Sequence, residues 1–223
     1  MGIKYRAVIF DCDGTLIDTI EDIAMAMNDA LQTHGYPTLP TSEYFSRVGW
    51  GIYKLAALVL PEEERTDENI EKLGKHAGRF MEELPMEKNL SKPYPGIKPL
   101  LGQLKERKIK IAVLSNKLDS VLQRIMVDFF SPLTFDAVYG LRPGLAPKPD
   151  PAAVWEMLAE MGYPPHQTIF VGDSEIDIET AKNSGCYPLG VSWGFRTKET
   201  LVKAGAAGII DDPQEIWDLI GRK

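Results

Sequence analysis

Two aspartates two residues apart follow an apolar segment near the start of the chain. The stretch AVIFDCDGTLIDT covers residues 7–19, and Asp11 and Asp13 come directly after residues 7–10. Asp13 with Gly14 fits a turn, because Asp bonds its own backbone and Gly accepts a positive φ. That interpretation does not explain Asp11, since a carboxylate at the end of a buried strand is costly to desolvate without a partner. A metal ion is a suitable partner, so the stretch indicates a functional site.

Polar residues also follow two later apolar segments. The segment IKIAVLS at 109–115 leads into Ser-Asn-Lys, and TIFVGD at 168–173 ends in an acid. Each polar residue has an ordinary interpretation: a serine or aspartate can cap a helix, and a loop lysine is usually solvated. If the strand ends meet, however, one cleft holds Asp11, Asp13, Ser115, Lys148, Asp173 and Asp177.

This set of residues fits phosphoryl transfer. Carboxylates can hold Mg²⁺, which takes oxygen ligands and keeps several waters. Asp11 can act as a carboxylate nucleophile and form an aspartyl-phosphate. Asp13 is near enough to protonate the leaving oxygen and then to activate water. Ser115, Lys148 and backbone amides can hold the phosphoryl oxygens as their charge shifts.

The sequence patterns around these residues predict that the elements which position them form an α/β domain. Continuous apolar runs predict buried strands of a parallel sheet at 5–11, 109–115, 168–173, 187–193 and 207–211. Helical patterns alternate with them at 97–107, 118–130, 150–161, 175–184, 197–204 and 213–221. This alternation predicts a doubly wound, Rossmann-like parallel sheet, whose ligands bind outside the carboxyl ends of the strands.

A long helical stretch separates the first strand from the second. Nearly all of it reads as helix, at 18–34, 41–48, 50–60 and 67–84, and Asp18 with Glu21 resembles a capping box at its start. Since a simple crossover needs only a dozen or so residues, we expect an inserted all-helical cap domain at 18–90. The α/β core then comprises residues 1–17 and 91–223, and the cap lies over Asp11.

Composition limits the function classes. The net charge of −7 argues against nonspecific nucleic-acid binding, which rests on basic patches. No stretch approaches the roughly 20 apolar residues of a membrane span, and the acids at 11 and 13 interrupt the first apolar run, so no signal peptide is expected. The cysteines, Cys12 and Cys186, form no disulfide framework. We therefore expect a cytoplasmic protein without a membrane or nucleic-acid partner, whose oligomeric state is open.

Four motifs in order resemble those of the haloacid dehalogenase-like hydrolase superfamily. They are Asp11-Cys12-Asp13-Gly14-Thr15, Ser115-Asn116, Lys148, and Gly172-Asp173 with Asp177. The resemblance implies a phosphatase with a small helical cap, with Asp11 as nucleophile and Asp13 as general acid and base. It implies Mg²⁺ held by Asp11, the backbone carbonyl of Asp13 and Asp173, with Asp177 supporting the metal or Lys148. It further implies phosphoryl binding by Ser115 and Lys148, next to Asn116.

Within this superfamily the chain looks most like the phosphoglycolate phosphatases. LSNK at 114–117 and the tail GVSWGFRTKETLVKAGAAGIIDDPQEI at 190–216 are similar to that group. We expect a small phosphorylated metabolite as substrate. A carboxylate-bearing substrate needs a further cation, for which Lys54 of the cap is the first candidate and Lys117 and Arg196 are the others.

Several other activities remain open within the same superfamily. Pyrophosphatases and broad-range sugar or nucleotide phosphatases share these features. A phosphomutase needs a cap base, usually histidine, where this chain has Ile23. A phosphonoacetaldehyde hydrolase uses a cap lysine as a Schiff base, and Lys54 lies in a similar place. A phosphate-binding protein without catalysis has no need for both Asp11 and Asp13.

Overall fold

The computed structural model describes residues 4–221, and within them six strands form one parallel sheet in the order β5-β4-β1-β6-β7-β8. Strand β1 (Ala7–Phe10) lies at the centre, between β4 (Lys110–Leu118) and β6 (Thr168–Gly172). The outer strands are β5 (Ala137–Leu141), β7 (Tyr187–Val191) and β8 (Gly208–Ile210). The predicted α/β fold with a doubly wound parallel sheet is confirmed.

The sheet is buried on both faces. Val8 and Phe10 belong to one apolar cluster, and Ala7 and Ile9 belong to a second. Successive side chains of a strand point to opposite faces, so the two clusters lie on the two sides of β1. This explains why the strands read as continuous apolar runs in the sequence rather than as alternating patterns.

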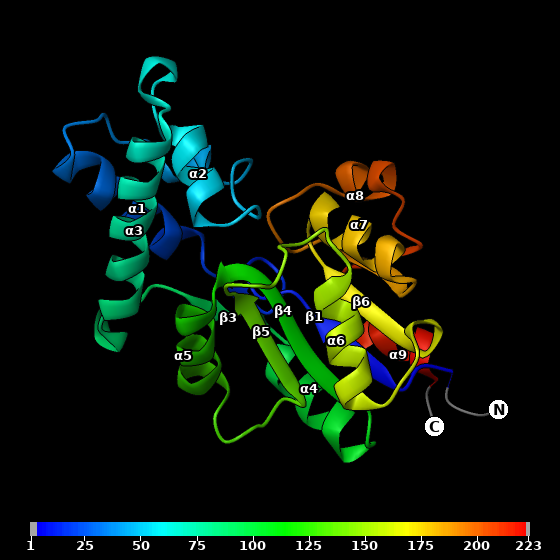
Figure 1. The fold of residues 1–223 in the computed structure, drawn as a ribbon. Coiled ribbons are helices and arrows are strands. Elements are labelled where there is room, and N and C mark those ends of the chain that lie inside the picture. Colours follow the sequence, from blue (N-terminus) through cyan, green and yellow to red (C-terminus); the bar gives the residue numbers. More distant parts are fainter. Residues whose placement is uncertain (1–3, 222–223) are drawn as a thin grey trace.

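Helices cover both faces of the sheet (Figure 1). Helices α4, α5 and α9 contribute to the first apolar cluster, and α6 and α7 to the second. Their bounds, with α8, are Ile97–Glu106 (α4), Asp119–Phe130 (α5), Ala152–Met161 (α6), Glu175–Ser184 (α7), Lys198–Ala204 (α8) and Ile216–Ile220 (α9). None of the helices within residues 4–221 combines the length and the apolar character that a bilayer span requires.

Three of the helices between β1 and β4 pack together next to the carboxyl end of β1 (Figure 1). They are α1 (Ile20–Thr33), α2 (Ile52–Val59) and α3 (Asp67–Glu83), and α3 packs against both α1 and α2. We use the word cap for residues 18–90. At its base, β2 (Ile17–Asp18) pairs with β3 (Lys92–Pro93) in antiparallel register. That the cap is a separate domain remains a prediction, and residues 1–3 and 222–223 of the predicted core lie outside the described residues.

The predicted helix at 41–48 is wrong. The structure has a 3-10 turn at Thr41–Glu43, followed by a loop. Backbone carbonyls of this loop, at Phe45 and Val48, accept hydrogen bonds from Arg196 of the core. These carbonyls are therefore engaged by a distant side chain rather than by the N–H groups of a following helical turn.

Two further details differ from the prediction. The capping box does not form, because Glu21 accepts a hydrogen bond from Thr41 Oγ1 at 3.0 Å instead of reaching back to residue 18. Strand β5 is absent from the predicted elements. It is short and contains Gly140, a weak strand former, whose N–H donates to Asp119 Oδ1 at 2.8 Å. Its place in the sheet comes from its pairing with β4, a contact that local pattern does not reveal.

Candidate active site

Two neighbouring strands at the centre of the sheet each lead into a buried aspartate. Asp11 follows β1 and Asp173 follows β6, and both side chains are buried. The strands pair in parallel, with Phe10 opposite Val171, and the N–H of Asp11 donates to Val171 O at 2.9 Å. The two carboxylates therefore leave the same edge of the sheet, as the sequence predicted.

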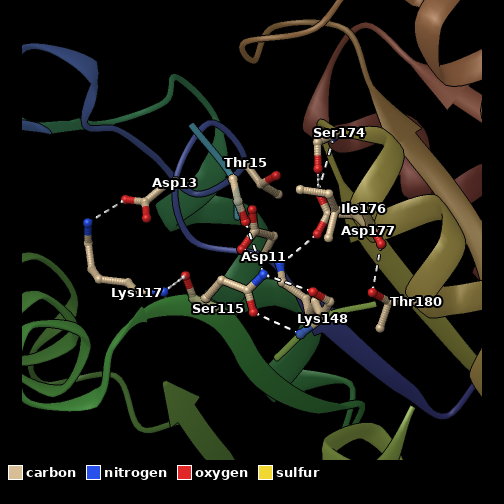
Figure 2. Close-up of polar contacts among 12 residues, drawn as sticks. Asp11, Asp13, Thr15, Ser115, Lys117, Lys148, Ser174, Ile176, Asp177 and Thr180 are labelled. Carbon is tan, nitrogen blue, oxygen red and sulfur yellow. Dashed lines mark hydrogen bonds and ion pairs between the residues drawn. The ribbon is translucent and has the colours of Figure 1, made fainter. Parts of the chain in front are cut away.

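Asp11, Asp173 and Asp177 form a cluster, and two of them, Asp11 and Asp177, pair with the ammonium group of Lys148 (Figure 2). One carboxylate oxygen from each acid lies within 4.8 Å of the other two. Lys148 Nζ lies 2.7 Å from Asp11 Oδ1 and 2.6 Å from Asp177 Oδ1. All four residues are buried, so the cluster holds three carboxyl groups and one ammonium group away from water.

The pKa values of these groups reflect that imbalance. Burial, and after it the charge of Asp177, raises the pKa of Asp11 well above its ordinary value, although Lys148 opposes the rise. The same two causes raise the pKa of Asp173 to about 7. Burial alone lowers the pKa of Lys148, but the charges of Asp11 and Asp177 outweigh it, and the pKa is raised.

The donor set fits a divalent cation. Carboxylates whose pKa is raised by burial and by mutual repulsion are stabilised as anions by a positive charge placed among them. Oxygen ligands from Asp11 and Asp173 suit a hard ion such as Mg²⁺. Gly14 leaves space beside Asp173, because a Cβ at residue 14 would overlap the Asp173 carboxylate, and its φ of +82° also favours glycine. The glycine of the first motif thus allows the Asp173 carboxylate to approach the backbone at residue 14.

Asp177 has two roles in the structure. Its Oδ2 accepts hydrogen bonds from Ser174 N at 3.1 Å and from Ser174 Oγ at 2.6 Å, at the start of α7. Its Oδ1 pairs with Lys148. One carboxylate oxygen of Asp177 therefore caps α7 and the other pairs with Lys148.

Asp13 lies on the other side of Asp11 and points away from the acidic cluster (Figure 2). Its Oδ1 accepts a hydrogen bond from Thr19 Oγ1 at 2.6 Å and lies 2.9 Å from Lys117 Nζ. The Lys117 side chain is only 4% exposed. Burial by itself lowers the pKa of Lys117. Asp13, together with the neighbouring Cys12 and Asp11, outweighs this effect, and the pKa lies above its ordinary value. Neither Thr19 nor the pairing of Lys117 with Asp13 was predicted.

Ser115 and Asn116 are buried near the end of β4. Ser115 Oγ accepts a hydrogen bond from the N–H of Lys117 at 3.2 Å. The Asn116 amide donates to Lys148 O at 3.1 Å and to Gly49 O of the cap at 3.0 Å, and its Oδ1 accepts from Lys148 N at 2.8 Å. Asn116 therefore holds together the second motif, the lysine loop and the cap.

A cavity of about 50 Å³ lies between the core and the cap. On the core side it is lined by both acids of the first motif and by the second motif. On the cap side the lining is apolar or glycine. The lining residues are Asp11, Asp13, Ser115, Asn116, Lys117 and Leu118 from the core, and Ile23, Val48, Gly49, Gly51, Ile52, Leu55 and Met81 from the cap.

Arg196 joins the core to the cap loop that lines this cavity. Its guanidinium donates to the carbonyls of Phe45 and Val48, the latter at 2.8 Å, and its Nε pairs with Glu175 at 3.1 Å. The neighbouring Phe195 packs edge-on against Phe45, and its N–H donates to Asp173 Oδ2 at 2.7 Å. Arg196, which binds the cap loop, is thus the next residue in the chain after Phe195, which binds Asp173 of the acidic cluster.

Two residues named from the sequence lie elsewhere or are inert. Lys54 is exposed on α2 and is not among the residues that line the cavity. Its role in substrate binding remains a prediction, and its position gives that role no support. Cys12 is buried next to the site, and burial raises its thiol pKa well above the ordinary value. This agrees with a packing role rather than a nucleophilic one.

Comparisons with known proteins agree on one family for this chain. The family model of haloacid dehalogenase-like hydrolases matches residues 8–191. A phosphoglycolate phosphatase of Aquifex aeolicus is 33% identical over 190 residues, which are 85% of this chain and 86% of that protein. A phosphoglycolate phosphatase of Haemophilus influenzae is 28% identical over 99% of this chain and 100% of that protein.

Solved structures agree with this result. The crystal structure of a predicted phosphoglycolate phosphatase from Haemophilus somnus superposes with a TM-score of 0.86 at 26% sequence identity, covering 97% of this chain and 98% of the other. The residues that the family model matches, 8–191, include all four motifs. The chain belongs to the haloacid dehalogenase-like hydrolase family, and within it resembles the phosphoglycolate phosphatases.

Proposed function

We propose that the protein is a Mg²⁺-dependent phosphatase that hydrolyses a small phosphate monoester, with 2-phosphoglycolate as the first substrate to test. The observation that carries the proposal is the buried cluster of Asp11, Asp173 and Asp177, in which Lys148 pairs with Asp11 and Asp177. The similarity to curated phosphoglycolate phosphatases over most of the chain supports the choice of substrate.

The reaction has two steps at Asp11. A carboxylate oxygen of Asp11 attacks the phosphorus atom, the bond between phosphorus and the ester oxygen breaks, and Asp13 gives a proton to the departing alcohol. Water then attacks the phosphorus atom of the aspartyl-phosphate, Asp13 takes a proton from this water, and inorganic phosphate leaves with the Asp11 carboxylate restored.

The other residues of the site hold charge and position. Asp11, Asp173 and the backbone carbonyl of Asp13 are the proposed ligands of Mg²⁺, which when bound neutralises the nucleophile and the phosphoryl oxygens together. Lys148 and Ser115 bind the phosphoryl group. Asp177 keeps the Lys148 ammonium group beside Asp11, at 2.6 Å from its own carboxylate.

Two alternative reactions receive less support from the site. Ile23 lines the cavity where a phosphomutase needs a cap base. Lys54, the candidate for a Schiff base with phosphonoacetaldehyde, is exposed and outside the cavity lining. A cavity of about 50 Å³ also favours a compact ester over a nucleotide in this arrangement of cap and core.

A phosphate-release assay tests the proposal. The purified protein is given 2-phosphoglycolate, pyrophosphate, a hexose phosphate and a nucleoside monophosphate, each with Mg²⁺ and with excess chelator. We expect release from 2-phosphoglycolate with Mg²⁺ and none in chelator. Asp11→Asn should lower turnover by roughly 10⁴-fold or more while the circular dichroism spectrum stays native. Release that survives Asp11→Asn at more than a tenth of the wild-type rate contradicts the mechanism.

A further inference from the structure

The cationic side chains near the site differ in how many partners within the protein they already bind. Lys148 lies between two carboxylates, Asp11 and Asp177. Arg196 is paired with Glu175 and with carbonyls of the cap loop. Lys54 is exposed and does not line the cavity. Among the described residues that line the cavity, Lys117 is the only lysine or arginine.

Lys117 has donor capacity left for a ligand. An ammonium group has three N–H donors, and within residues 4–221 the ion pair found for Lys117 is the one with Asp13, at 2.9 Å. Its side chain is 4% exposed, so little water competes for the remaining donors. Burial among apolar cap residues such as Leu55 and Met81 strengthens any charge interaction made there.

The position of Lys117 in the site determines which part of a bound substrate its ammonium group contacts. Asp13 is the proposed proton donor to the departing oxygen, and Lys117 lies directly beside Asp13. Lys148 lies beside Asp11, away from Asp13 (Figure 2), and is the residue proposed above to bind the phosphoryl group. An anion bound by Lys117 is therefore attached to the alcohol that leaves, within a few atoms of the ester oxygen.

We infer that Lys117 determines specificity by binding a carboxylate carried by the leaving group, as in the phosphate ester of a small 2-hydroxy acid. This inference rests on the proposed phosphatase function and adds the residue that selects the substrate. The apolar cap lining surrounds the short carbon chain between ester oxygen and carboxylate. A neutral alcohol of the same size leaves the remaining Lys117 donors without an acceptor.

The test compares a charged with a neutral leaving group. Values of kcat/KM are measured for 2-phosphoglycolate and for ethyl phosphate, with wild type, Lys117→Met and, as a matched control, Lys72→Met, an exposed lysine on α3. We expect Lys117→Met to lose about 10- to 150-fold on 2-phosphoglycolate, the range for a hydrogen bond to a charged group, mostly through KM. The loss on ethyl phosphate should be several-fold at most, and Lys72→Met should match wild type on both.

Binding without turnover gives a second measurement. In an Asp11→Asn background, calorimetric titration with 2-phosphoglycolate and with ethyl phosphate should show the same selective loss on adding Lys117→Met. Lys117→Gln replaces Lys117→Met if the latter does not fold. Equal losses on both ligands overturn the inference, because they assign Lys117 to the positioning of Asp13 alone. A selective loss in Lys54→Met instead of Lys117→Met also overturns it.

The two proposals fail in different ways. If wild type releases phosphate from ethyl phosphate and other esters without preference for 2-phosphoglycolate, the phosphatase function stands and the Lys117 inference is wrong. If wild type releases phosphate from no ester, the proposed function is wrong, and the calorimetric comparison still decides whether Lys117 binds a carboxylate.

Discussion

Lys148 Nζ lies 2.7 Å from Asp11 Oδ1. This ion pair is buried and joins two residues that are far apart in the sequence. The same ammonium group also pairs with Asp177 at 2.6 Å. Lys148 is therefore the charge that compensates the buried carboxyl groups of Asp11 and Asp177, in addition to any role in holding a phosphoryl group.

Replacing Lys148 with methionine should destabilise the metal-free protein. Removing one partner of a buried ion pair typically costs about 3–5 kcal/mol, because the remaining charge stays uncompensated. Urea unfolding in chelator measures the change in the free energy of unfolding. Lys110→Met is the matched control, since Lys110 pairs with Asp136 but is 44% exposed, and exposed pairs contribute about 1 kcal/mol or less. Equal effects of the two substitutions would contradict this role of Lys148.

The stability of the metal-free protein should fall as the pH rises from about 4 to about 7. The pKa of Asp173 is about 7 in the folded protein against an ordinary value of 3.8. Between these values the folded state holds more protons than the unfolded state, so the free energy of unfolding decreases with pH. The raised pKa of Asp11 acts in the same direction.

Urea midpoints in chelator at pH 5 and pH 7.5 measure this effect. Asp173→Asn should show a smaller fall than wild type, because its amide does not titrate. Added Mg²⁺ should raise the wild-type midpoint at pH 7.5, since a ligand that binds only the folded state stabilises it. Parallel pH profiles for wild type and Asp173→Asn would show that Asp173 does not titrate in this range.

Arg196→Met should loosen the cap. The substitution removes the hydrogen bonds to the carbonyls of Phe45 and Val48 and leaves the cap loop without this tie to the core. Hydrogen bonds from a charged donor contribute about 1.5–3 kcal/mol, so we expect at least a tenfold loss in kcat/KM, with KM raised. Limited proteolysis should cut the loop around residues 44–51 sooner than in wild type.

The control for the cap loop is Arg47→Met. Arg47 lies in the same loop but pairs within the cap, with Glu43 at 2.7 Å. It should leave both kcat/KM and the rate of proteolysis close to wild type. If the Arg47 and Arg196 variants behave alike, the bonds from core to cap do not hold the loop.

Thiol reagents should leave the enzyme active. Cys12 lies between the two acids of the first motif, but it is buried and its thiol pKa is raised. Thiolate, which is the reactive form, is therefore scarce at pH 8. Incubation of the native protein with iodoacetamide, followed by mass spectrometry, should find Cys12 unmodified and phosphate release unchanged. Rapid alkylation of Cys12 with loss of activity would mean that the thiol is exposed and reactive.

The sequence alone was sufficient for the centre of the fold and for the outline of the site. Strands β1, β4 and β6 are buried on both faces, so each appears as a continuous apolar run whatever surrounds it. In a parallel sheet their carboxyl ends share one edge. A polar residue after each run, such as Asp11 or Asp173, is therefore placed near the others by topology alone. The catalytic roles of these residues remain proposals.

Only the tertiary structure decided where the cations lie. From the sequence Lys54 was the first candidate and Lys117 and Arg196 were its rivals, although the pattern does not show in which direction a long flexible side chain points. Packing leaves Lys54 in solvent, buries Lys117 beside Asp13, and directs Arg196 to the cap loop. The loop after residue 43 and strand β5 depend likewise on partners distant in the sequence, Arg196 and β4. Local pattern carries no information about such contacts, since their energy arises only once the chain has folded.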